Sequence, residues 1–113
     1  MTIKELIEKI PMEIVSGENS LNREITRGFS SDMMSNVIAN GGEGDVWLTF
    51  QTHLNVIAIA LMKKMSCVIL IQNRALIPQA LEKAQNENIP VLMSSLSAYE
   101  LSGRLFKLGI PGD

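Results

Sequence analysis

The chain has 113 residues, of which 46% are hydrophobic, 4% aromatic and 19% charged. This length predicts a single domain over residues 1–113, and the hydrophobic share is too high for a disordered chain. Lys and Arg number 10 against 12 Asp and Glu, so the formal net charge is −2. Without a basic excess, nucleic acid is not expected as a partner.

A single cysteine, Cys67, excludes an internal disulfide and a site with several cysteine ligands. Because it lies in an apolar run, we interpret it as a small buried side chain. The longest apolar stretches, Val56–Met62 and Cys67–Ile71, are far shorter than the roughly 20 residues of a membrane-spanning helix. The charged N-terminus is unlike a signal peptide. We therefore expect a cytoplasmic protein with no membrane partner.

Short elements are predicted at the start of the chain. Thr2–Glu5 matches a capping box, and the apolar residues that follow repeat at helical spacing until Pro11 ends the helix. Residues 13–15 and 23–29 are predicted as short strands. The turn-rich segment 17–22 separates them.

From about residue 29 the pattern alternates regularly between strands and helices. Apolar runs predict the strands, and helical spacing between caps and stops predicts the helices. The predicted strands are Val46–Phe50, Cys67–Ile71 and Pro90–Met93. The predicted helices are capped by Ser30–Asp32 and run to Ala39, span Asn55–Lys64, begin at Pro78, and run from a capping box at Ser97–Glu100 to Lys107.

This order of elements predicts an α/β fold. It is a mostly parallel sheet with helices on both faces, because buried strands joined by helical crossovers pair in parallel. The β-α-β-α-β-α core is preceded by an N-terminal helix and short strands.

Polar residues follow each core strand. In open α/β sheets, ligands bind beyond the carboxyl ends of the strands, where helix N-termini favour anions. Arg74 would supply the counter-charge for a phosphate or carboxylate. The same residues could instead only cap helices, so both interpretations stand. The predicted ligand-binding residues are Ser31, Asp32, Gln51, Thr52, His53, Gln72, Asn73, Arg74, Ser94 and Ser95.

His53 is the only histidine, so a site with several histidine ligands is excluded, and neither a metal nor a cofactor is expected. As a general base it would need an orienting carboxylate, for which Asp32 is the candidate. A binding contact and a loop or capping role are the alternatives. The sequence contains neither GxxxxGK[ST] nor GxSxG, and the glycine-rich run Gly41–Asp45 enters a strand, so we interpret it as a turn.

The Met33-Met34 pair is interpreted as core filling, with an adaptable partner surface as the alternative.

Four segments in this order resemble the DRTGG domain in its stand-alone form, and the resemblance extends over nearly the whole chain. They are Gly28–Ser35, Gly44–His53, Ile89–Met93 and Ser95–Leu105. The earlier segment Ser16–Thr26 resembles the start of the HPr kinase N-terminal domain, which is related in fold. One departure is that Ile71–Asn73 replaces the Thr-Gly-Gly that the family tends to have.

The resemblance implies a regulatory or associative role, since DRTGG domains accompany phosphotransacetylases and pyrophosphatases. It also implies a homodimer and a partner enzyme related to iron hydrogenase, because stand-alone copies are found beside hydrogenase genes. Kinase activity is not implied. In the HPr kinase that chemistry belongs to a separate P-loop domain, whose motif this sequence lacks.

We therefore expect a non-enzymatic regulatory or protein-interaction module. It would sense a small anionic or nucleotide ligand in association with iron-hydrogenase or acetate/phosphate metabolism. One alternative is an enzyme acting on a phosphorylated metabolite through His53, Asp32 and Arg74. A second alternative is a ligand-free structural scaffold for a redox enzyme complex.

Overall fold

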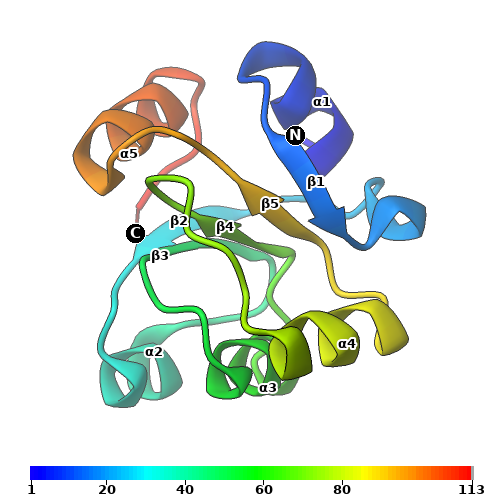
Figure 1. Cartoon of the computed structure of the whole chain (residues 1–113). Helices are drawn as coiled ribbons and strands as arrows, with labels where there is room; N and C mark the ends of the chain where they lie inside the picture. Colours follow the sequence, from blue (N-terminus) through cyan, green and yellow to red (C-terminus); the bar gives the residue numbers. More distant parts are fainter. Residues whose placement is uncertain (113) are drawn as a thin grey trace.

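In the computed structural model a five-stranded sheet carries helices on both faces (Figure 1). Residues 1–112 are described, so Asp113, the last residue of the predicted domain, lies outside the described residues. The strands are β1 (Glu13–Ser16), β2 (Arg27–Ser30), β3 (Asp45–Thr49), β4 (Cys67–Leu70) and β5 (Val91–Met93). The helices are α1 (Ile3–Lys9), the 3-10 turn η1 (Glu18–Ser20), α2 (Met34–Asn40), α3 (Leu54–Met62), α4 (Pro78–Asn86) and α5 (Ala98–Lys107).

The sheet has the order β1-β5-β4-β3-β2, with β2 to β5 parallel and β1 antiparallel at one edge. Each parallel pair is joined through a helix, which is the connection that parallel pairing requires. All four residues of the central β4 are buried, as expected for a strand covered on both faces. The predicted mostly parallel α/β fold is confirmed.

Alternate residues of the strands supply two separate cores. Leu48 and Ile69 pack in the layer that contains α1 and α5. Trp47 and Val68 point to the opposite layer, which contains α2, α3 and α4. Figure 1 shows the same division, with α1 and α5 on one side of the sheet and α2, α3 and α4 on the other. This period of two is the geometry of a strand buried on both faces.

The first part of the predicted strand 23–29 does not join the sheet, and β2 begins only at Arg27. The backbone of residues 23–25 pairs instead with the N-terminal segment, since Ile25 donates to the Met1 carbonyl and Ile3 to the Arg23 carbonyl. The Ile25 amide and the Arg23 carbonyl are therefore already bonded to the start of the chain. From Arg27 onward, β2 pairs with β3 in regular parallel register.

The helix predicted at Asn55–Lys64 begins one residue earlier, as α3. The helix is apolar on several sides, and its Leu54, Leu61 and Met62 are exposed. α3 packs against the sheet with α2 and α4 on either side of it, so only its outer side is open to solvent. Within residues 1–112, no helix combines the length and apolar character needed to cross a bilayer.

A buried ion pair fixes β2 to β3 at their amino ends. The Arg27 guanidinium donates to both carboxylate oxygens of Asp45, at 2.9 and 2.6 Å. The Asp45 side chain is 2% exposed, and it also accepts from the Gly42 amide at 2.8 Å. A bidentate pair with a further amide donor compensates the desolvation of this carboxylate. The turn between α2 and β3 is therefore held closed.

We predict that Cys67 resists thiol reagents in the folded protein. Burial raises the pKa of the Cys67 thiol to about 12, and the thiolate is the reactive form. With an Ellman-type reagent at pH 8, Cys67 should react only as fast as the protein unfolds. An exposed thiol introduced on a cysteine-free background, Ser95→Cys with Cys67→Ala, should react at once. Equal rates for the two thiols in native buffer would contradict the burial of Cys67.

Candidate functional site

The loops that follow β2, β3, β4 and β5 lie side by side, because the parallel register aligns the carboxyl ends of these strands. We call this edge the strand-end rim. It consists of the ten predicted ligand-binding residues together with Phe50. Hydrogen bonds join its loops in two groups, one around Asp32 and one around Gln72 and Asn73.

The first group is centred on the carboxylate of Asp32, in the loop after β2. Its Oδ1 accepts from the Thr49 hydroxyl at 2.9 Å and from the Phe50 amide at 2.7 Å. The Gln51 side-chain amide donates to the Asp32 carbonyl at 3.2 Å. The loops after β2 and β3 are therefore tied together through side chains and backbone at once.

These contacts correct the prediction that Ser30–Asp32 caps α2. The N-cap residue is Met33, and it makes no side-chain cap. The Asp32 carboxylate instead contacts the end of β3, at Thr49 and Phe50. Ser31 serves the start of the helix only in part, since its hydroxyl accepts from the Met33 amide at 3.3 Å and from the Asn36 side chain at 3.0 Å.

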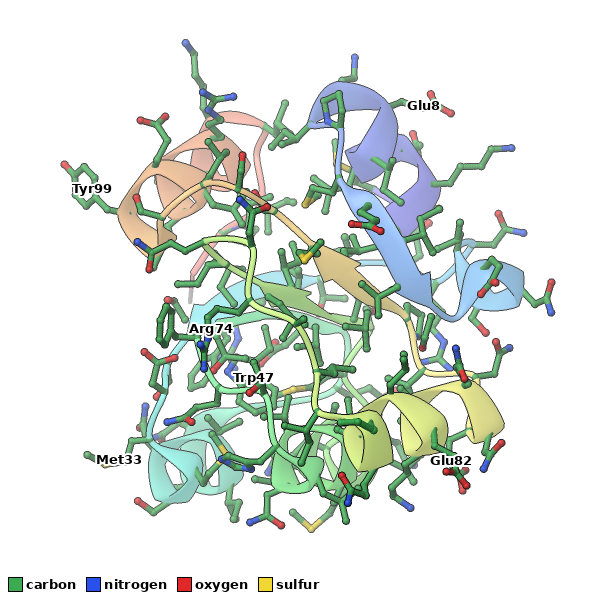
Figure 2. All side chains as sticks on the ribbon, viewed as in Figure 1. Glu8, Met33, Trp47, Arg74, Glu82 and Tyr99 are labelled. Atoms are coloured by element: carbon green, nitrogen blue, oxygen red, sulfur yellow. The ribbon has the colours of Figure 1, made fainter. Side chains whose placement is uncertain are left out.

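Arg74, labelled in Figure 2, comes from the loop after β4. Its guanidinium lies against the Phe50 ring. Its guanidinium carbon is 4.3 Å from the centroid of the Phe50 ring, and its Nε donates to the Phe50 carbonyl at 3.2 Å. A guanidinium over a ring face is a cation–π contact. Arg74 is exposed, and in residues 1–112 it forms no ion pair with a carboxylate.

The second group joins the loops after β4 and β5. The Gln72 amide donates to the Leu96 carbonyl at 2.9 Å, and the Asn73 amide donates to the Ser94 carbonyl at 2.8 Å. Gln72 and Asn73 have φ angles of 52° and 58°, in the left-handed region that favours glycine. Both residues therefore adopt a backbone conformation that glycine prefers, and their amides already donate to carbonyls within the protein.

The remaining predicted residues are Thr52, His53, Ser94 and Ser95. Thr52 and Ser94 form hydrogen bonds that hold nearby backbone in place. The Thr52 carbonyl accepts from the Ile77 amide at 3.1 Å, so Thr52 holds the start of α4. Ser94 is buried, and its hydroxyl accepts from the Leu96 amide at 3.1 Å, whereas Ser95 is exposed. His53 is the N-cap residue of α3 and its side chain makes no cap hydrogen bond.

The pairing of His53 with Asp32 that a general base requires is not formed among the described residues. The Asp32 carboxylate is bonded to Thr49 and Phe50, and neither contact involves the imidazole. The same described residues contain no group of three or more His, Cys, Asp and Glu side chains placed to hold a metal ion.

Two residues of the rim's framework were not found from the sequence. Phe50 was assigned only to a strand, yet it is the surface on which Arg74 rests. An aromatic residue at the end of the predicted strand Val46–Phe50, next to polar loop residues, is the signal that marks it. Trp47 was likewise predicted only as part of the strand Val46–Phe50. It is fully buried, and its indole N–H also donates to the Ser31 carbonyl at 2.9 Å, so it supports the loop after β2.

Comparison with known proteins gives a structural match and no sequence match. No family model and no curated protein matches this chain. The fold is similar to a crystal structure of the CBS and DRTGG domains of the regulatory region of a Clostridium perfringens pyrophosphatase, in complex with its activator diadenosine tetraphosphate. The TM-score is 0.72 and the sequence identity 16%, over 97% of this chain and 47% of that chain. This chain thus spans about half of the matched chain, and the likeness supports a DRTGG-like fold.

The left-handed backbone at Gln72 gives a testable prediction. A non-glycine residue in this region costs roughly 1–2 kcal/mol, while glycine costs about 0.5–1 kcal/mol in chain entropy. Gln72→Gly should therefore raise the free energy of unfolding by about 0.5–1 kcal/mol, measured by urea denaturation. The matched control Gln85→Gly, in the right-handed backbone of α4, should lower it by a similar amount. Destabilisation by both substitutions would show that Gln72 is not strained.

Proposed function

We propose that this DRTGG-like domain is a non-enzymatic regulatory module that binds a small anionic ligand, of the nucleotide or phosphate type, at the strand-end rim. The observation that carries the proposal is the exposure of the Arg74 side chain and its contacts. This side chain is an exposed cation fixed against Phe50, with no carboxylate partner in the described part of the chain.

The geometry of Arg74 suits it to hold a phosphate. The Phe50 ring contacts one face of the guanidinium, and the hydrogen bond to the Phe50 carbonyl uses only Nε. Both terminal nitrogens lack partners among residues 1–112, so the edge that binds phosphate in a bidentate manner is available. Because the side chain is already positioned, less rotamer entropy is lost when a ligand binds.

The backbone of the rim limits what else can hold the ligand. The amides of Gln72, Asn73 and Arg74 all donate to protein carbonyls, so they do not form a phosphate cradle. The ligand would therefore depend on the Arg74 side chain, with hydroxyl and amide groups such as Ser95 and Gln51 as further candidate contacts. If one cation holds the ligand, the binding affinity should fall strongly when that residue is removed and when the ionic strength is raised.

The regulatory role is favoured over catalysis by the positions of His53 and Asp32. The alternative enzyme requires these two to act together, whereas Asp32 is bonded to Thr49 and Phe50. The pyrophosphatase region of similar fold is regulatory and was solved with a nucleotide activator, which supports the proposal by analogy of fold only. A link to iron hydrogenase or to acetate metabolism stays a prediction of the sequence resemblance.

The proposal predicts that polyphosphates stabilise the protein. A ligand at 100 times its dissociation constant adds about 2.7 kcal/mol of stability. For a domain of this size, each kcal/mol raises the melting temperature by roughly 4–8 °C. Thermal unfolding should be followed with pyrophosphate, adenine nucleotides and diadenosine tetraphosphate. At least one should give a saturable shift, and Arg74→Ala should abolish it.

Two matched variants make this test specific. Arg74→Lys keeps the charge but loses the bidentate edge, so it should retain only part of the shift. Arg104→Ala removes an exposed arginine that lies on α5, outside the strand-end rim, and pairs with Glu100, so it should keep the full shift. No shift with any of these anions would contradict the ligand proposal and favour the scaffold alternative. A shift that survives Arg74→Ala would place the ligand elsewhere.

A further inference from the structure

Helix α5 presents an aromatic stripe to solvent. Tyr99 is 91% exposed and Phe106 is 72% exposed, although large aromatic side chains are usually well covered. Figure 2 shows Tyr99 projecting away from α5. With Ser102 and Gly103, these residues follow the spacing i, i+3, i+4, i+7, so they form one continuous face of the helix. We call these four residues the α5 stripe.

The stripe borders a groove of about 480 Å³ between α5 and β2. Phe29, Leu48 and Pro111 contribute apolar surface to it. The free edge of β2 is partly occupied by the chain itself, since the Gly28 amide donates to the Pro111 carbonyl at 2.8 Å. Pairing of a further strand along β2 is therefore obstructed, while the α5 stripe stays open.

The α5 stripe is complementary to a second copy of itself. In an antiparallel pair of α5 helices related by a two-fold axis between positions 102 and 103, Tyr99 of each copy lies opposite Phe106 of the other. The small residues Ser102 and Gly103 meet at the centre. A Cβ added to Gly103 would meet no atom within 4 Å, so nothing in its own chain obstructs the approach of a second helix there. Isologous contacts of this kind are the commonest route to homodimers.

The charges of α5 agree with this arrangement. Glu100 lies in the first turn, and Arg104 and Lys107 lie in the last turn, all on one flank of the stripe. An antiparallel two-fold places equivalent flanks together, so Glu100 of each copy comes beside Arg104 and Lys107 of the other. A parallel two-fold pair would instead place the charged flanks of the two copies on opposite sides of the interface, so these charges could not pair. The charge pattern therefore selects the antiparallel pair, which also opposes the two helix dipoles.

We propose that two copies of this chain associate through the α5 stripe, as an antiparallel helix pair about a two-fold axis. The four aromatic rings can bury about 600–1,000 Å² together. Stable interfaces bury roughly 1,200–2,000 Å², so the walls of the groove must add the remainder and the dimer should be of moderate affinity. The surface is separate from the strand-end rim, and the proposal does not depend on a ligand there.

Sedimentation velocity of the ligand-free protein from 1 to 500 µM tests the dimer. The wild-type chain should pass from monomer to dimer within this range. Tyr99→Ala and Phe106→Ala should each weaken association at least tenfold while circular dichroism and melting temperature stay unchanged. Met33→Ala removes another apolar side chain, 65% exposed, and should leave the dimer intact.

A charge-reversal pair tests the geometry. Glu100→Lys gives an α5 flank with only positive charges, and the double variant Arg104→Glu with Lys107→Glu gives a flank with only negative charges. Each variant alone should be monomeric, and an equimolar mixture should form a heterodimer.

The proposal is overturned by a wild-type chain that stays monomeric at 500 µM, by a dimer that withstands Tyr99→Ala and Phe106→Ala, or by one that Met33→Ala disrupts. Failure of the charge-reversed mixture to associate would overturn the antiparallel arrangement. Since none of these variants alters Arg74 or Phe50, anion binding at the rim can be measured in each of them and judged separately.

Discussion

The carboxylate of Asp32 bridges the ends of β2 and β3, and the order of the rim depends on this bridge. One carboxylate oxygen accepts hydrogen bonds from both the Thr49 hydroxyl and the Phe50 amide. The hydroxyl is buried, so loss of its acceptor would leave an unsatisfied donor at a cost of about 1–3 kcal/mol. The bridge fixes the backbone of Phe50, and Arg74 rests on that residue through its ring and its carbonyl. Three loops thus converge to position one cation.

Much of the fold was predictable because burial and periodicity are local properties of the sequence. The buried run at β4 and the Thr2 capping box were confirmed. Other features depended on which of several partners a side chain contacts in the folded chain. A capping residue and a cross-strand acceptor look alike in sequence, so Asp32 was assigned to α2. The stacking of Phe50 under Arg74 joins residues 24 positions apart, and no local pattern reports such a contact.

The rim and the α5 stripe are distinct surfaces that share one connecting segment. Residues 94–97 leave β5, accept the Gln72 and Asn73 amides at the rim, and end at Ser97, whose hydroxyl caps α5. The segment is therefore bonded both to the loop that carries Arg74 and to the helix that carries Tyr99. This arrangement places the proposed ligand-binding surface and the proposed dimer surface at the two ends of a short, hydrogen-bonded connection.

Arg74 is the proposed anion-binding group, and NMR observes its side chain most directly. In ¹⁵N-labelled protein the Nε–H resonance of each arginine can be followed while pyrophosphate is added. We expect a saturable shift of the Arg74 resonance together with the Phe50 amide, and no shift of the Arg104 resonance on α5. Saturable shifts confined to other residues, or no shift at millimolar pyrophosphate, would contradict it.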